Sequence, residues 1–245
     1  MLGTLALILV SSVNVSAQSW KSLKNKVKEQ TNRLSIPKEL LSSGALSQAE
    51  VGRGLKEALN QGVRKGVEQL NKKDGYLKDP QIKIPMPDEF KKVEEKLRAL
   101  GQGKKVDEAI ESMNRAAEDA AEGAKDIFVA AIKGMTLTDA MSILKGEDDA
   151  ATKYLNKATS VELTERFEPV IKACLDKVGA TKHWNTVCRS YNKLPFVNKV
   201  NPDLEKYVTK KALKGLFLQV SKEELNIRQD PAARGTDLLK KVFGK

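Results

Sequence analysis

The chain has 245 residues and a net charge of +11 at pH 7, and aromatic residues make up only 5% of it. This length suits one large domain or two small ones, and the core must come mostly from aliphatic side chains and alanine. So few aromatic residues exclude a surface that stacks the bases of single-stranded nucleic acid, and specific nucleic-acid binding is not expected. Abundant Ala, Leu, Lys and Glu favour helices.

Residues 1–17 are predicted to be a secretory signal peptide. Leu2 to Val10 is a short apolar run, and small residues follow it up to Ala17, so cleavage is expected between Ala17 and Gln18. No Lys or Arg precedes the apolar run. The alternative is a membrane anchor, but a span needs about 20 apolar residues and Ser11, Ser12 and Asn14 interrupt this run. We therefore expect a periplasmic or secreted protein without a transmembrane span in the mature chain.

Residues 18–45 are expected to form a basic amphipathic leader. Trp20, Leu23, Val27 and Leu34 recur at roughly helical spacing, and the basic excess of the chain lies largely in residues 18–40 and 201–245. The leader could lie on a surface or dock loosely as a helix. The basic ends of the chain could attract an anionic envelope component. Alternatively, the positive charge serves only to keep the protein in solution.

Residues 46–245 are expected to form a single helical domain. Ser47 and Glu50 have the spacing of a capping box, which predicts that a helix begins there. Small residues recur every four positions on this helix, beside an apolar stripe: Gly54, Ala58, Gly62 and Gly66. Glycine inside a helix costs up to about 1 kcal/mol of helix stability relative to alanine. Because small residues let another backbone approach closely, we expect this stripe to pack against another helix of the domain. It could instead line a ligand groove or a dimer seam. Charged residues on the same helix exclude a membrane location.

Residues 72–89 break the helical pattern and contain three of the eight prolines. Proline removes a backbone donor and disfavours helix before it. Ile82, Ile84 and Met86 alternate with other positions, so we expect an extended segment whose apolar side lies on the helices and crosses them.

The rest of the chain is also predicted to be helical. The whole protein is therefore expected to be an all-α bundle of about nine helices. Asp88 is expected to cap one helix, and Thr136 with Asp139 to begin a short one. Asp149 stands where an acid favours the start of the next helix. Pro169 marks a kink or a fresh start, and Thr236 is expected to cap a last helix.

Two cysteines, Cys174 and Cys188, flank a predicted turn at Gly179-Ala180. In an antiparallel helix pair they would lie at nearly the same height, so a disulfide is a candidate. The alternative is two separate buried thiols. With a single histidine, His183, and no C-x-x-C motif, no metal site is expected.

The sequence contains few residues that indicate catalysis. No glycine-rich nucleotide motif is present, and no cofactor is expected. His183 is expected to have a surface or capping role rather than to act as a catalytic base. Asn114, Glu118 and Glu122 are spaced by four residues, and Arg115 can reach Glu118. This polar cluster could be an exposed ion-pair face, a partly buried network, or a ligand site.

Several segments then support a resemblance. They include "KIPMPDEFKKVEEKLRALGQGKKVDEAIESMNRAAEDA", "AKDIFVAAIKGMT", "DDAAT", "YVTKKALKGLF" and "IRQDPAARGTDLLKKVFG". The chain resembles the bacterial family catalogued as domain of unknown function 4197, over about Leu46 to Gly244. The resemblance implies an exported, mostly helical protein of Gram-negative envelopes with no established activity. It also places five residues in family motifs without a known role: Asn114, Arg115, Glu118, Asp149 and Arg234. The cysteines and His183 are not part of that pattern.

Three functions remain. The leading hypothesis is a non-enzymatic exported protein that binds an unidentified partner, either an anionic envelope component or another envelope protein. The first alternative is a carrier of a small apolar ligand, which an enclosed apolar cavity of about 300 Å³ or more would favour. The second is an enzyme with an unrecognised site, which a buried carboxylate with a strongly shifted pKa would favour.

Overall fold

The computed structural model describes residues 47–193, 199 and 203–230. The chain divides into residues 1–45 and 46–245, and all described residues belong to the second unit. The predicted signal peptide with its cleavage site Ala17–Gln18, the basic leader, Arg234 and the last predicted helix lie outside the described residues.

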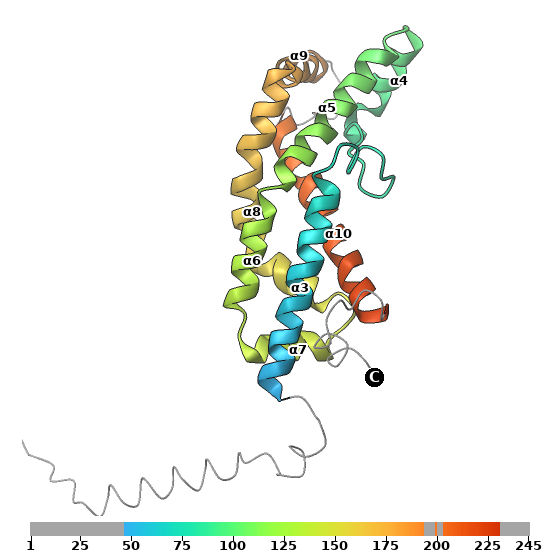
Figure 1. Cartoon of the computed structure of the whole chain (residues 1–245). Helices are drawn as coiled ribbons and strands as arrows, with labels where there is room; N and C mark the ends of the chain where they lie inside the picture. The colour runs from blue at the N-terminus through green and yellow to red at the C-terminus, as the bar shows by residue number, and fades with distance from the viewer. Residues whose placement is uncertain (1–46, 194–198, 200–202, 231–245) are drawn as a thin grey trace, which may run out of the picture. The chain divides into compact units, whose positions relative to one another are not determined.

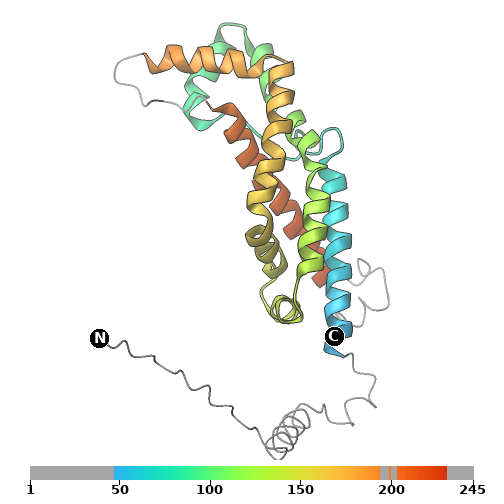
Figure 2. The ribbon, with the colours of Figure 1, turned by 90° about the vertical axis from the view of Figure 1, so that its left-hand side faces the viewer.

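The described residues form α-helices and no strand, which confirms the predicted all-α bundle. The α-helices within the described residues are α3 (Gln48–Leu70), α4 (Lys91–Ala99), α5 (Gly103–Ala121), α6 (Ala124–Gly134), α7 (Leu137–Lys145), α8 (Ala150–Lys177), α9 (Ala180–Asn192) and α10 (Leu204–Gln229), with a 3₁₀ turn η1 (Asp88–Phe90) before α4. Three helices, α3, α6 and α8, run alongside one another, and α10 crosses them obliquely in contact with α8 and α3 (Figures 1 and 2).

The core is aliphatic and alanine-rich, as the low aromatic content requires. On α8, Leu155, Leu163 and Ile171 are fully buried. Four alanines of α5 are also buried: Ala116, Ala117, Ala120 and Ala121. Because alanine has almost no side chain, α5 can lie close against α8, which it contacts extensively.

Local signals predicted the helix starts well, with two exceptions. Both capping boxes form, Ser47 with Glu50 and Thr136 with Asp139. Asp88 makes no side-chain cap bond and instead pairs with Lys91, with Nζ and Oδ1 2.7 Å apart. Pro169 does not begin a new helix, because α8 continues through it from Ala150 to Lys177.

The segment between α3 and η1, residues 71–87, is named the strap here. Residues 71–82 form mostly turns, and residues 83–87 have no regular secondary structure. Its apolar side chains are buried on the helices: Ile84 is fully buried, and Ile82 and Met86 are nearly so. The Tyr76 hydroxyl donates to the carbonyl of Ala212 on α10 at 2.9 Å. A Cβ at Gly215 would lie 2.7 Å from the Tyr76 ring, so glycine there makes room for the strap.

α10 lies against the small-residue stripe of α3. A Cβ built at Gly62 would be 3.2 Å from Cδ1 of Ile227, and one at Gly66 would be 3.5 Å from Cγ of Gln219. Ala58 contributes to a small buried cluster with Ile227, and Gly54 is buried as well. The stripe thus provides space that side chains of α10 fill.

Replacing Gly62 with leucine is expected to lower the free energy of unfolding by about 1–3 kcal/mol, the usual cost of overpacking. The branched side chain would have to displace Ile227 or separate α3 from α10. Urea unfolding of the purified variant measures the change. A Gly134→Leu variant is the matched control, because a Cβ at Gly134 meets nothing within 4 Å. Equal stability of the two variants would contradict close packing at the stripe.

In the described part of the chain no single helix is long and apolar enough to cross a membrane; α6 and α7, bent by 104° at their junction, together reach that length and composition.

Candidate functional site

Asn114 on α5 forms hydrogen bonds to the strap much as a β-strand neighbour would. Its side-chain Oδ1 accepts from the backbone N–H of Ile84 at 2.8 Å, and its Nδ2 donates to the carbonyl of Ile84 at 2.9 Å. Nδ2 also donates to the carbonyl of Ile110. Asn114 is fully buried, and both of its side-chain polar atoms are hydrogen-bonded inside the protein.

Glu118, one turn along α5, holds the other end of the strap. Its Oε1 accepts from the backbone N–H groups of Tyr76 and Leu77, at 3.1 and 3.2 Å. Its Oε2 lies 2.6 Å from Nη1 of Arg115. The side chain of Glu118 is only 3% exposed, and burial of a polar group is costly unless hydrogen bonds such as these satisfy it.

Arg115 completes this arrangement by joining Glu118 to Asp74 at the start of the strap. Nη2 of Arg115 lies 2.7 Å from Oδ1 of Asp74. Hydrogen bonds from Lys78 and then Arg115 lower the pKa of the Asp74 carboxyl to about 2. Burial, and then the negative charge of Glu118, raise the pKa of the Tyr76 hydroxyl. We call Asn114, Arg115 and Glu118 the strap clamp. Of the three possibilities for the polar cluster, the contacts are those of a partly buried network.

Two other members of the predicted set are not in the strap clamp. Asp149 precedes α8, where it pairs with Lys153 at 2.8 Å and its side chain is 44% exposed. Arg234 lies outside the described residues. Glu122, spaced like Asn114 and Glu118, is exposed.

A cavity of about 990 Å³ lies where the strap, α4, α5, α9 and the ends of α8 and α10 meet. Its lining is mainly apolar and includes Met86, Phe90, Val93, Leu97, Val106, Ala109, Met113, Val178, Trp184 and Leu204. Charged side chains of both signs also line it, among them Lys105, Glu108, Arg115, Asp119 and Lys177. The volume lies at the upper end of the range usual for small-molecule sites, about 300–1,000 Å³.

One wall of the cavity is formed by α4, whose apolar side is only partly covered by the rest of the protein. No residue of α4 is buried, although Val93 and Leu97 pack partly against the core. The helix ends at Ala99. Gly101 follows with a φ of +76°, which suits glycine, and the turn brings α5 back beside α4. α4 therefore forms one wall of the cavity rather than filling it.

A family model with the description "Protein of unknown function (DUF4197)" matches residues 45–244. The chain belongs to this family. No curated protein and no solved structure matches it.

In this DUF4197 protein the predicted disulfide is wrong, because the structure contains no disulfide bond between Cys174 and Cys188. α9 projects sideways from the end of α8 instead of returning along it (Figure 2), so equal distances from the turn do not bring the two residues level. The thiol of Cys174 donates to Oδ2 of Asp119 at 3.3 Å, and Cys188 is fully buried. Burial raises the pKa of the Cys188 thiol to about 11, and burial followed by Asp119 raises that of Cys174. Neither thiol has the lowered pKa of a reactive cysteine.

The described residues contain no group of three or more His, Cys, Asp and Glu side chains that could hold a metal ion. His183 lies on the cavity lining and is exposed.

Glu224 on α10 is the buried carboxylate that the sequence analysis missed in this DUF4197 chain. Oε1 accepts from the backbone N–H of Ala151 at 3.0 Å, and Oε2 accepts from the N–H and hydroxyl of Thr152, both at 2.8 Å. Arg228 donates to the same carboxylate from one turn further along. Glu224 thus caps α8 from another helix. The spacing of four residues between Glu224 and Arg228 indicates that the two side chains can pair on one helix. It does not indicate that Glu224 also contacts the start of α8.

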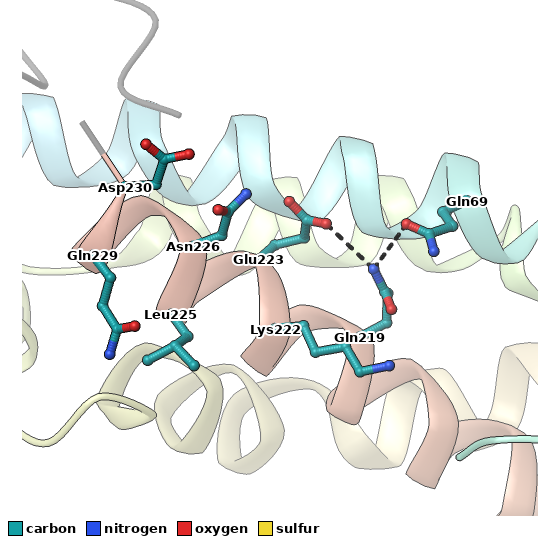
Figure 3. A pocket seen from close by; sticks show the side chains of 8 residues that line it. All are labelled: Gln69, Gln219, Lys222, Glu223, Leu225, Asn226, Gln229 and Asp230. Carbon is teal, nitrogen blue, oxygen red and sulfur yellow. Dashed lines mark hydrogen bonds between the residues drawn. The ribbon is translucent and has the colours of Figure 1, made fainter. Parts of the chain in front are cut away.

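A second, more open recess lies between α3 and α10 (Figure 3). Nε2 of Gln219 donates to Oε1 of Gln69 at 3.0 Å and to Oε1 of Glu223 at 3.3 Å. Lys65 lies 3.0 Å from Glu223. The contacts of Gln219 with Gln69 and of Glu223 with Lys65 join α10 to α3 next to Gly62 and Gly66. The recess has little apolar surface to bury a ligand, and the cavity is the stronger candidate.

Proposed function

We propose that this DUF4197 protein is an exported, non-catalytic binding protein whose cavity takes the apolar part of one small amphiphile. The observation that carries the proposal is the cavity of about 990 Å³ with a mainly apolar lining. Apolar surface that a ligand removes from water contributes roughly 25 cal/mol per Å² to binding. A polar or charged end of the ligand can remain among the charged side chains at the cavity.

A non-catalytic role is supported by how the polar groups are used. Asn114 and Glu118, the best buried polar residues of the cluster, are occupied by backbone groups of the strap. The two thiols have raised pKa values, which lowers their nucleophilicity at neutral pH. Export rests on the apolar run and small residues of positions 1–17.

Native mass spectrometry of protein purified from the producing cells tests export and binding together. We expect a polypeptide that begins at Gln18, with a noncovalent adduct of the mass of one small amphiphile that is lost under denaturing conditions. A chain that keeps residues 1–17 would contradict export. A preparation without adduct that also fails to bind added amphiphile would contradict the binding function.

Filling the cavity should weaken binding. Ala109 on α5 lines the cavity and is half-buried, so tryptophan at this position would occupy ligand space. We expect Ala109→Trp to weaken binding of the fluorescent amphiphile anilinonaphthalene sulfonate at least about tenfold, or about 1.4 kcal/mol. Titration followed by fluorescence measures the affinity.

Ala130→Trp is the matched control, because Ala130 is exposed on α6 and does not line the cavity. It should bind the probe as the unmodified protein does. If both variants bind equally well, the probe binds elsewhere and the cavity is not the site.

A further inference from the structure

One side of α10 carries lysines and no acid. Between positions 206 and 225, the exposed and half-exposed residues on this side recur at helical spacing. We call them the α10 stripe, which consists of Lys206, Tyr207, Lys210, Lys211, Lys214, Leu218, Ser221, Lys222 and Leu225. The acids of α10 lie elsewhere on the helix. Glu205 pairs with Lys172 of α8, and Glu223 and Glu224 are buried.

The lysines near the two ends of the stripe are paired. Nζ of Lys206 lies 2.9 Å from Oδ2 of Asp203, the residue before α10. Nζ of Lys222 lies 3.3 Å from Oδ2 of Asp79 in the strap. These two pairs offset the positive charge at the ends of the stripe but leave its middle unaffected.

The middle of the stripe keeps its positive charge. Lys210, Lys211 and Lys214 make no ion pair with the described residues. Asp88 is close enough to Lys211 for the lysine to contribute to its lowered pKa, but its hydrogen bond with Lys91 is the larger cause. Three lysines within two turns of one helix therefore remain without a carboxylate of their own.

Two exposed leucines lie among these lysines. Leu218 and Leu225 are each 38% exposed. The exposed side of α8 is different, because it mixes charges of both signs, such as Lys157, Glu162 and Arg166. A mixed surface suits a helix that faces only water. Charges of one sign beside exposed leucines suit a partner that is anionic at its surface and apolar beneath it.

We propose that the α10 stripe is the surface by which this protein binds an anionic lipid bilayer. Lipid phosphates attract the three unpaired lysines, and the two leucines can enter the boundary between headgroups and acyl chains. Because the apolar side of α10 is packed inside the bundle, the contact is peripheral and weakens as salt rises. The inference goes beyond the proposed function and requires no ligand in the cavity.

A bilayer fits the stripe better than a soluble polyanion does, because a polyanion offers no apolar phase to Leu218 and Leu225. The stripe also begins close to the cavity, since Leu204 at the start of α10 lines it. A bilayer bound along α10 would lie near the site that we propose for an amphiphile. The membrane would then be the source of that amphiphile.

Sedimentation of the mature chain with vesicles tests the inference. The vesicles contain phosphatidylglycerol mixed with phosphatidylcholine, or phosphatidylcholine alone. We expect binding to the anionic vesicles only. Lys210→Glu combined with Lys214→Glu should weaken this binding at least about tenfold, or about 1.4 kcal/mol.

Lys133→Glu combined with Lys157→Glu is the matched control. Both lysines are exposed, on α6 and α8, and the change in net charge is the same. The control should therefore weaken binding only slightly. If both double variants lose the same affinity, net charge alone attracts the protein to the vesicles and the inference is overturned. If neither loses affinity, another part of the chain binds them, and the inference is equally overturned.

A leucine variant separates a bilayer from a soluble polyanion. Leu218→Gln should weaken binding to anionic vesicles about threefold, because less apolar surface leaves water. Binding to soluble polyglutamate should not change. Val161→Gln is the control, because Val161 on α8 is 74% exposed but lies outside the stripe. If Leu218→Gln binds the vesicles as tightly as the control does, the stripe does not enter a bilayer and the inference is overturned.

A footprint on the unmodified protein needs no variant to fold. Acetylation of lysines, read by mass spectrometry, should slow at Lys210 and Lys214 when anionic vesicles are added. It should not slow at Lys133 and Lys157. Equal rates at all four positions would overturn the inference. Because anilinonaphthalene sulfonate binding to the cavity is measured without vesicles, failure of the stripe leaves the proposed function untouched.

Discussion

Glu118→Ala is expected to lower the free energy of unfolding by about 3 kcal/mol or more. The substitution leaves the backbone N–H groups of Tyr76 and Leu77 without their carboxylate acceptor, and each buried donor left unpaired costs about 1–3 kcal/mol. It also removes the 2.6 Å ion pair with Arg115. Urea unfolding followed by circular dichroism measures the change.

Two variants on the same helix make this result specific. Glu122→Ala removes an exposed carboxylate and should change stability by no more than about 0.5 kcal/mol. Glu118→Gln keeps an oxygen that can accept from the strap while losing the charge, so it should lie between the alanine variant and the unmodified protein. If Glu118→Ala were as mild as Glu122→Ala, the strap would not depend on this carboxylate.

The strap clamp also bears on the cavity. The strap contains Met86 and leads into η1, which contains Phe90. Both residues line the cavity, and Arg115 belongs to both the strap clamp and the lining. A loosened strap would therefore shift one wall of the cavity. It would also shift the Phe90 ring, whose centroid lies 4.1 Å from that of Trp184. The polar network of α5 is therefore connected to the cavity through Arg115 and through the strap.

The features that the sequence predicted correctly are local ones. A capping box joins two residues three positions apart, so Ser47 and Thr136 mark helix starts without reference to the rest of the fold. The apolar alternation of Ile82, Ile84 and Met86 likewise indicated which side of the strap is buried. Spacing alone also brought Asn114, Arg115 and Glu118 together on α5, although it did not identify the strap as their target.

The features that the sequence did not predict depend on angles and contacts between distant elements. The disulfide prediction assumed that α9 returns along α8, and nothing in the Gly179-Ala180 turn specifies the angle between them. The cavity requires α4, α5 and α9 to meet without filling the space between them. Glu224 contacts Thr152 from 72 positions away, which no periodicity within either helix reveals.

Glu224→Ala is the second large expected effect, about 3–5 kcal/mol of lost stability. Removal of one member of a buried ion pair usually costs this much, because the other charge stays buried. Here the remaining member is Arg228, whose side chain is 11% exposed. The first turn of α8 also loses the acceptor of two backbone N–H groups and the Thr152 hydroxyl.

Asp149→Ala provides the decisive comparison, because Asp149 is the acid that the sequence placed at the start of α8. It makes no side-chain cap bond and pairs with Lys153 on the surface, so its loss should cost no more than about 1 kcal/mol. Chemical unfolding of the two variants under the same conditions ranks the two acids. A larger loss for Asp149→Ala would mean that the nearby acid stabilises α8, and that the carboxylate from α10 does not act as its cap.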